Sequence, residues 1–288
     1  MKSFLRAVSR FSASLLILIF VSQCLFPHVD VLAATYRQKA LRLTLSKLMD
    51  EEQKKPQIRL MAQVLDLLPR EHYEDLLKID YNPRATHLPR GMAKSDHLII
   101  NSFQIDDNSE FTSVFIHEIG HVADLGYLTD PLNRTEKSHF YYPNGKSVEQ
   151  FDPSLRFYMV SWNDSHSKKN NDNLNFISTY GMSNPFEEFA ESYNFFVLHR
   201  ENFYDRSREN IPLRRKYNFL KHTVFKDQEF DFYSAENYPK VIYDTTLLPF
   251  DLNKLVLYAE ERDDRRRVNG RTRVRRQARF PRKILVKA

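Results

Sequence analysis

Residues 117–121 read H-E-I-G-H, and their types and spacing could bind a metal ion and activate a water molecule. Residues four apart in a helix lie about 40° apart around its axis, so His117 and His121 would project from one face. Two such imidazoles can bind one zinc ion, with Glu118 beside them as a base for a water molecule. Apolar residues on both sides of the motif predict a buried helix. We therefore expect a zinc site, and the alternative is a chance coincidence of two histidines and one glutamate.

A catalytic zinc ion needs a third protein ligand and an open position. The metzincin pattern would place glycine and histidine at positions 124 and 127, but the chain has Asp124 and Tyr127, which excludes that class. A third ligand from the helix that carries His121 would be strained. We therefore expect Asp124 to face solvent or to support a histidine.

A second motif, Y-G-M-S-N-P-F-E-E-F-A-E, spans residues 180–191. Asn184 is a favourable N-cap, and Pro185 suits the first helical position, so a helix is predicted from here to about residue 199. This helix would present glutamates near its start. It is the region in which we look for the third ligand.

Three glutamates of this predicted helix are candidates for the site. Glu187 could complete the metal shell, although a capping-box glutamate would stand at the same position. Glu191 lies one turn further on the same face and could accept the free N–H of a ligating histidine. Glu188 and Glu191 are the alternative ligands if Glu187 is not used.

The two motifs together resemble those of the gluzincin-type zinc metallopeptidases related to the anthrax lethal factor catalytic domain and the Pro-Pro endopeptidases. The resemblance implies zinc ligands at His117, His121 and Glu187, with Glu118 as the general base. It also implies that Tyr180, seven residues before the glutamate ligand, hydrogen-bonds the developing oxyanion.

The resemblance covers roughly residues 95–200 and implies a zincin-like fold. The chain departs from these relatives in the longer stretch between the second histidine and the glutamate ligand, which contains a polar region at 128–176. This insertion leaves the substrate specificity open. Trp162 and several tyrosines in it could line substrate pockets or could simply pack within the loop.

The fold class that we expect is α+β, mostly helical with a small sheet, and with N-terminal helices before the catalytic core. Residues 97–101 (H-L-I-I-N) predict a short strand, either an edge strand that receives an extended peptide or an ordinary core strand. The expected parts are a signal peptide at 1–34, a helical segment at 35–94, a zincin core at 95–200 with a loop insertion at 128–176, the remainder of the catalytic unit at 201–261 and a basic tail at 262–288.

The N-terminus is typical of a secretory signal. Lys2, Arg6 and Arg10 precede a short apolar core, and small residues permit cleavage after Ala33. The protein is therefore expected to be secreted or periplasmic, or membrane-anchored if the signal is not cleaved. The single cysteine, Cys24, lies within this segment, so disulfide and thiol chemistry are not expected in the mature protein.

The chain of 288 residues has a formal net charge of +6, but the charge is unevenly distributed. Residues 1–34 carry +2 and residues 262–288 carry +10, which leaves −6 for residues 35–261. A hydrophobic content of 42% is that of a globular protein. The common Gly-rich phosphate-binding motifs are absent from the sequence, which argues against nucleotide chemistry.

The Arg-rich tail, residues 262–288, is expected to be a disordered, solvated segment, and the alternative is a patch that contacts an anionic surface. Nucleic acid is disfavoured as a partner because Phe280 is the only aromatic residue in the tail.

The function that we expect is that of a secreted zinc endopeptidase acting on a protein or peptide substrate. The alternative is a catalytically silent binding or regulatory protein that keeps a peptidase fold and is attached to an anionic surface through its tail.

Overall fold

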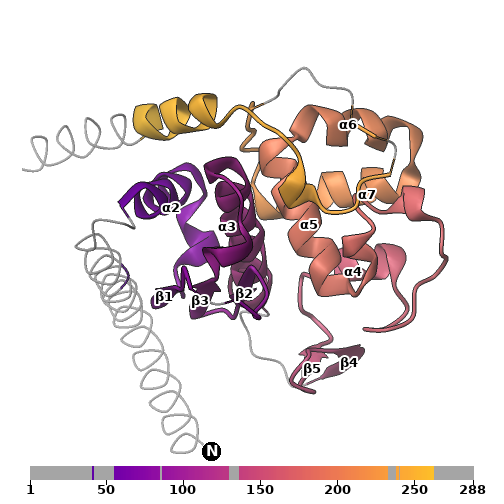
Figure 1. Ribbon diagram of the computed structural model, residues 1–288. Helices are drawn as coiled ribbons and strands as arrows, with labels where there is room; N and C mark the ends of the chain where they lie inside the picture. Colours follow the sequence, from indigo (N-terminus) through magenta and orange to yellow (C-terminus); the bar gives the residue numbers. More distant parts are fainter. Residues whose placement is uncertain are drawn as a thin grey trace, which may run out of the picture.

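The computed structural model describes residues 41, 55–84, 86–129, 136–232, 238–239 and 241–262. The expected signal peptide and nearly all of the expected basic tail lie outside these residues. The described part is α+β and mostly helical with small sheets, as the sequence predicted (Figure 1). None of its helices is long and apolar enough to cross a membrane.

The helices and strands follow one another in an order that brings two distant helices together at the centre. The longer helices are α2 (Lys55–Leu67), α3 (Asn108–Val122), α4 (Leu155–Ser161), α5 (Pro185–Leu198), α6 (Arg200–Glu209) and α7 (Ile211–Phe219). The strands are β1 (Lys78–Tyr81), β2 (Gly91–Ala93), β3 (His97–Ile100), β4 (Lys137–Tyr141) and β5 (Ser147–Glu149). The last described helix covers residues 252–262.

The sheet beside α3 has the strand order β1-β3-β2. β3 pairs in parallel with β1 and antiparallel with β2, with Leu98 opposite both Ile79 and Ala93. The predicted strand is therefore confirmed, and of the two positions considered for it the ordinary core strand is correct and the edge strand is wrong. β3 is the central strand, and β2 forms the edge.

The segment at 35–94 that we expected to be helical contains helix α2 but also two strands. Residues Lys78–Tyr81 alternate between exposed and buried side chains, the two-residue period of a strand, and pair with β3. Gly91–Ala93 forms the edge strand. One sheet thus joins residues from both sides of the boundary expected at 94/95.

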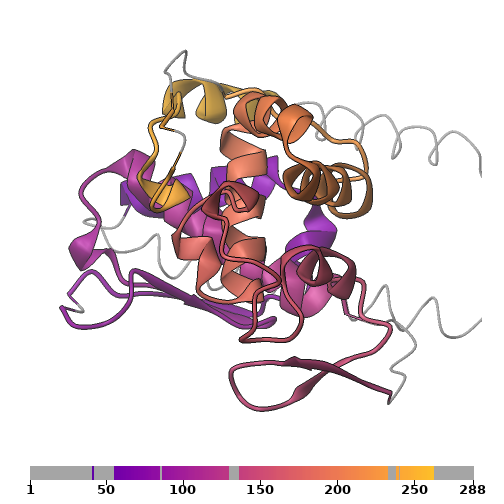
Figure 2. The ribbon, with the colours of Figure 1, turned by 90° about the vertical axis from the view of Figure 1, so that its right-hand side faces the viewer.

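Helix α3 lies between the sheet, α2 and α5 (Figures 1 and 2). Eleven of its residues are buried, because apolar residues occur on all its faces. A Cβ atom at Gly120 would lie 3.2 Å from both Ala190 Cα and Tyr193 Cβ of α5. The glycine in the middle of H-E-I-G-H therefore permits α5 to approach the two histidines closely.

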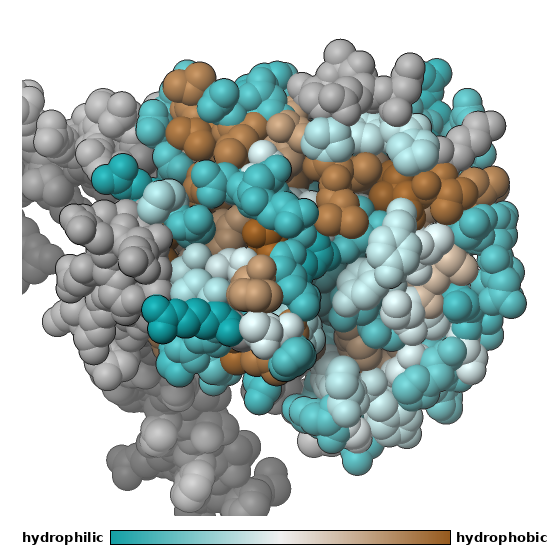
Figure 3. Space-filling model, viewed as in Figure 1, coloured by the Kyte–Doolittle hydropathy of each residue, from teal (hydrophilic) through white to brown (hydrophobic). Residues whose placement is uncertain are grey.

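The insertion 128–176 is more ordered than the long loop that we expected. It contains the β4–β5 hairpin, helix α4 and a short turn of 3-10 helix, Asn173–Asn175. The reason is its own apolar content: Phe140, Val148, Phe157 and Trp162 are all buried. Trp162 is thus a core residue and does not line a substrate pocket. In the space-filling view, the lower part of the face, where the hairpin lies, is mostly hydrophilic (Figure 3).

Three helices meet around a buried ion pair. The Lys216 ammonium on α7 donates to Glu188 Oε1 on α5, and both side chains are at most 1% exposed. Trp162 Nε1 donates to the second oxygen of Glu188 at 2.7 Å, and Lys216 also donates to the carbonyl of Asn175 at 2.6 Å. The contacts satisfy both charges and attach the insertion to the central helix.

Replacing Lys216 with alanine should lower the free energy of unfolding by about 3–5 kcal/mol, because the Glu188 carboxylate would remain buried without a counter-charge. The control is Lys221→Ala, which removes a surface pair with Glu229 and should cost less than about 1 kcal/mol. Urea unfolding of the three proteins measures both losses. Equal losses in the two variants would contradict a structural role for the buried pair.

Candidate metal centre

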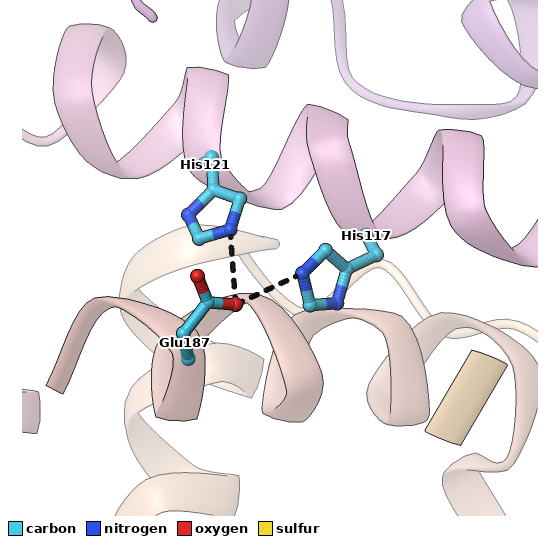
Figure 4. A group of neighbouring side chains, drawn as sticks. All are labelled: His117, His121 and Glu187. Atoms are coloured by element: carbon cyan, nitrogen blue, oxygen red, sulfur yellow. Dashed lines mark ion pairs between the residues drawn. The ribbon is translucent and has the colours of Figure 1, made fainter. Parts of the chain in front are cut away.

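Three side chains from two helices point toward one another at the packed face of α3 and α5 (Figure 4). Glu187 Oε2 on α5 lies 3.3 Å from His117 Nε2 and 3.4 Å from His121 Nε2 on α3. The three ligand atoms lie within 4.8 Å of one another. The structure therefore brings together the three residues that the sequence assigned as metal ligands.

The start of α5 places Glu187 at this point. Asn184 caps the helix as expected, and its side-chain oxygen accepts the backbone N–H groups of Phe186 at 3.0 Å and Glu187 at 2.9 Å. Pro185 occupies the first helical position. The Glu187 side chain is then free to face the histidines instead of serving the cap.

The chemistry of the three donors fits a metal ion. Glu187 Oε2 is buried, and its contacts with the two histidine nitrogens are longer than usual hydrogen bonds and not well aligned as such. Burial would raise the pKa of Glu187, but the adjacent His117 and His121 hold it well below its usual range. Burial would lower the histidine pKa values, but Glu187 raises both. Acceptor lone pairs that converge in this way require positive charge, supplied by protons or by a metal ion.

Glu191 contacts His117 at the ring nitrogen that does not face Glu187. Its Oε1 lies 3.0 Å from His117 Nδ1. Its Oε2 accepts the Ser178 hydroxyl at 2.5 Å and the Thr245 backbone N–H at 2.9 Å. A carboxylate held in this way favours the proton on Nδ1 and leaves Nε2 as the ligand atom, the supporting role that the sequence suggested for Glu191.

Glu118 lies beside the histidines in a space that only glycine leaves open. It is 5% exposed, and its Oε2 has no hydrogen-bond partner within the described part of the chain. A Cβ at Gly91 on β2 would clash with Glu118 Oε1. Burial raises the pKa of the Glu118 carboxyl. The sequence analysis did not identify Gly91, because the rarity of glycine in the chain was the only sign that this residue matters.

Tyr180 stands in the short turn Tyr180–Met182 that precedes α5. Its ring lies 6.2 Å from the His117 ring, and 39% of the residue is exposed. Burial and the neighbouring Glu187 raise the pKa of its phenol, so the hydroxyl keeps its proton. Tyr180 lines a cavity of about 280 Å³ together with Glu118 and Glu187.

This cavity continues into a larger cleft of about 740 Å³, with which it shares Ala93, Leu125 and Pro143. Ala93 belongs to the edge strand β2, whereas Pro143 lies in the turn of the β4–β5 hairpin. The insertion 128–176 therefore contributes one wall of the cleft, through Pro143 and Tyr142. The sequence analysis considered the tyrosines of the insertion as pocket-lining residues, and Tyr142 is one of them, but it did not identify Pro143.

Two other acidic residues considered in the sequence do not belong to the group of three donors. Glu188, the alternative ligand, is bound to Lys216 and Trp162 in the core. Asp124 is 1% exposed, so the expectation that it faces solvent is wrong, and it accepts the Tyr158 hydroxyl at 2.5 Å. Burial raises the pKa of Asp124 to about 7. Glu188 is therefore bound elsewhere and not a ligand, and Asp124 is held by Tyr158 in the core.

No family model, curated protein or solved structure matches the chain.

The geometry predicts one divalent metal ion per chain. His121→Ala and Glu187→Ala should each lower the zinc affinity by more than the roughly 10–100-fold that loss of an outer partner costs, and Glu191→Gln should fall within that range. Glu118→Gln should bind zinc as tightly as the unaltered protein, and it is the matched control. Titration with zinc and a competing chelator measures all four. Undiminished binding by Glu187→Ala would place the third ligand elsewhere.

Proposed function

We propose that the protein is a zinc-dependent endopeptidase. The observation that carries the proposal is the convergence of two histidines and one glutamate beside a buried carboxylate, Glu118, that has an unpartnered oxygen in the described structure. Export through the N-terminal segment would place the activity outside the cytoplasm. The resemblance to the gluzincin-type metallopeptidases supports the same function.

His117, His121 and Glu187 form the donor set of a catalytic zinc site, in which a fourth position stays open. The chemistry that zinc supplies at such a site is Lewis-acid polarisation of a carbonyl and acidification of a water molecule. Glu191 keeps the ligand nitrogen of His117 directed at the site through its 3.0 Å contact with the other ring nitrogen.

Glu118 would act as the general base and then as the general acid. Its unpartnered oxygen can take a proton from the attacking water, and the raised pKa caused by burial makes it a better base than an exposed carboxylate. The same carboxyl would deliver this proton to the amine that leaves. Gly91 keeps the room that the carboxylate needs. A merely structural helix pair would need neither the unpartnered carboxylate nor this space.

Tyr180 would stabilise the negative charge that develops on the carbonyl oxygen. Its phenol retains its proton and lines the cavity that Glu118 and Glu187 also line. A donor that faces developing charge in a partly desolvated site contributes more than it would in water.

The edge strand β2 favours an extended peptide as the substrate. β2 pairs only with β3 among the described strands, and Gly91, Met92 and Ala93 all line the cavity at the metal centre. A peptide chain could add to this free edge and pass the three donors, as in other cases of strand addition. The substrate-binding role considered for residues 97–101 therefore belongs to β2 in this proposal.

Glu118→Gln tests the proposal directly. The amide cannot take a proton, so peptide cleavage should fall by about 100-fold or more while zinc stays bound. Tyr180→Phe should lower kcat by about 100-fold with little change in zinc content. Cleavage of a fluorogenic peptide is measured beside the metal content of each protein. A Glu118→Gln variant that still cleaves at the original rate would rule out the mechanism.

A further inference from the structure

The segment Ile242–Leu247 touches two of the groups that support the proposed chemistry. The carbonyls of Ile242 and Tyr243 accept the backbone N–H groups of Thr179 and Tyr180, each at 2.8 Å. The backbone N–H of Thr245 donates to Glu191 at 2.9 Å. One stretch of chain, more than 50 residues after α5 begins, thus holds both the turn that carries Tyr180 and the carboxylate that orients His117.

Asp244 is the residue through which this segment is fastened. Its Oδ1 accepts the backbone N–H of Thr246 at 2.8 Å and the hydroxyl of the same residue at 2.6 Å. Its Oδ2 accepts from the Arg90 guanidinium. Only 6% of Asp244 is exposed, so its charge depends on these donors.

Arg90 connects the segment Ile242–Leu247 to the N-terminal turn of α3. Its second guanidinium nitrogen donates to Glu110 Oε1 at 2.5 Å, in the first turn of α3. Arg90 also directly precedes Gly91, the residue that makes room for Glu118. Because a planar guanidinium presents its donors in a fixed fork, it can hold two carboxylates at a defined separation.

The carboxylates of Glu110 and Asp244 also prevent Arg90 from binding a substrate. Arg90 lines two cavities that Tyr180 also lines, where its guanidinium could have bound an anionic group of a substrate. Glu110 and Asp244 already occupy both of its terminal nitrogens and supply two negative charges against its one. The positive charge of Arg90 is therefore neutralised within the protein and does not bind a substrate anion.

We infer that Arg90 is a positioning residue: by holding Asp244 against α3 it fixes the segment Ile242–Leu247, which in turn places Tyr180 and Glu191. This inference rests on the proposed peptidase function. An ion pair outside the metal centre thus controls the position of two groups at the metal centre.

Arg90→Gln tests the inference through kcat, measured at saturating zinc. The variant should lower kcat by about 10–100-fold, the range for lost outer partners of a metal site, with a smaller change in KM. In a Tyr180→Phe background, the same substitution should lower kcat by a smaller factor than it does in the unaltered protein, because one of the two groups through which it acts has been removed. Arg90→Lys, which can hold one carboxylate but not two, should give an intermediate kcat.

Asp244→Asn is the second variant, and it is the gentler one because its amide oxygen can still accept from Thr246. It should lower kcat in the same direction, which keeps the test decisive if Arg90→Gln does not fold. The matched control is Arg200→Gln. Arg200 also holds a loop, through the carbonyl of Phe230 and the Glu229 carboxylate, but none of these three residues lines the cavities that Tyr180 lines. It should leave kcat unchanged.

A kcat within about 2-fold of the unaltered protein in folded Arg90→Gln would overturn the inference. So would a double variant, Arg90→Gln with Tyr180→Phe, whose loss of kcat equals the product of the two single losses. An unaltered protein that binds zinc but cleaves nothing would instead overturn the proposed function. In that case the zinc affinity decides the inference: weaker binding by Arg90→Gln supports it through Glu191, and equal binding contradicts it.

Discussion

The close packing of α3 against α5 is the contact on which the rest of the site depends. Glu187 can face His117 and His121 because Gly120 lets the two helix backbones approach without a side chain between them. The approach is favoured by the burial of apolar residues along both helices, including Phe115, Ile119, Phe189 and Tyr193. The desolvation of three acceptor groups that converge on one point is thus offset by hydrophobic packing around it, and a bound cation would offset it further.

Each group at the centre is held from a different part of the chain. Glu191 reaches His117 from α5 and is itself held by Ser178 and Thr245. The backbone of Tyr180 is held by the segment after residue 241. Glu118 fits into the space that Gly91 of the edge strand leaves open. Such a site loses its geometry when any supporting segment moves, which is why residues remote from the three donors are expected to affect the proposed catalysis.

Local signals in the sequence were sufficient for the elements that carry the ligands. The four-residue spacing of His117 and His121 and the Asn184-Pro185 helix start each depend on neighbours in the chain, and both were predicted correctly. Contacts between distant segments were not accessible in this way. The pairing of β2 with β3 and the ion pair of Arg90 with Asp244 depend on how segments meet in space. The insertion was mistaken for a loop because its polar residues outnumber the few apolar ones that form its own core.

The most direct test of the central claim is a cleavage profile of the unaltered protein on a peptide library, followed by mass spectrometry. The same protein is measured as purified, after removal of metal with a chelator, and after addition of zinc. We expect cleavage at internal peptide bonds that disappears with the metal and returns with zinc. A protein that binds one zinc ion per chain and leaves the whole library intact would contradict the account, and so would cleavage that persists after the metal has been removed.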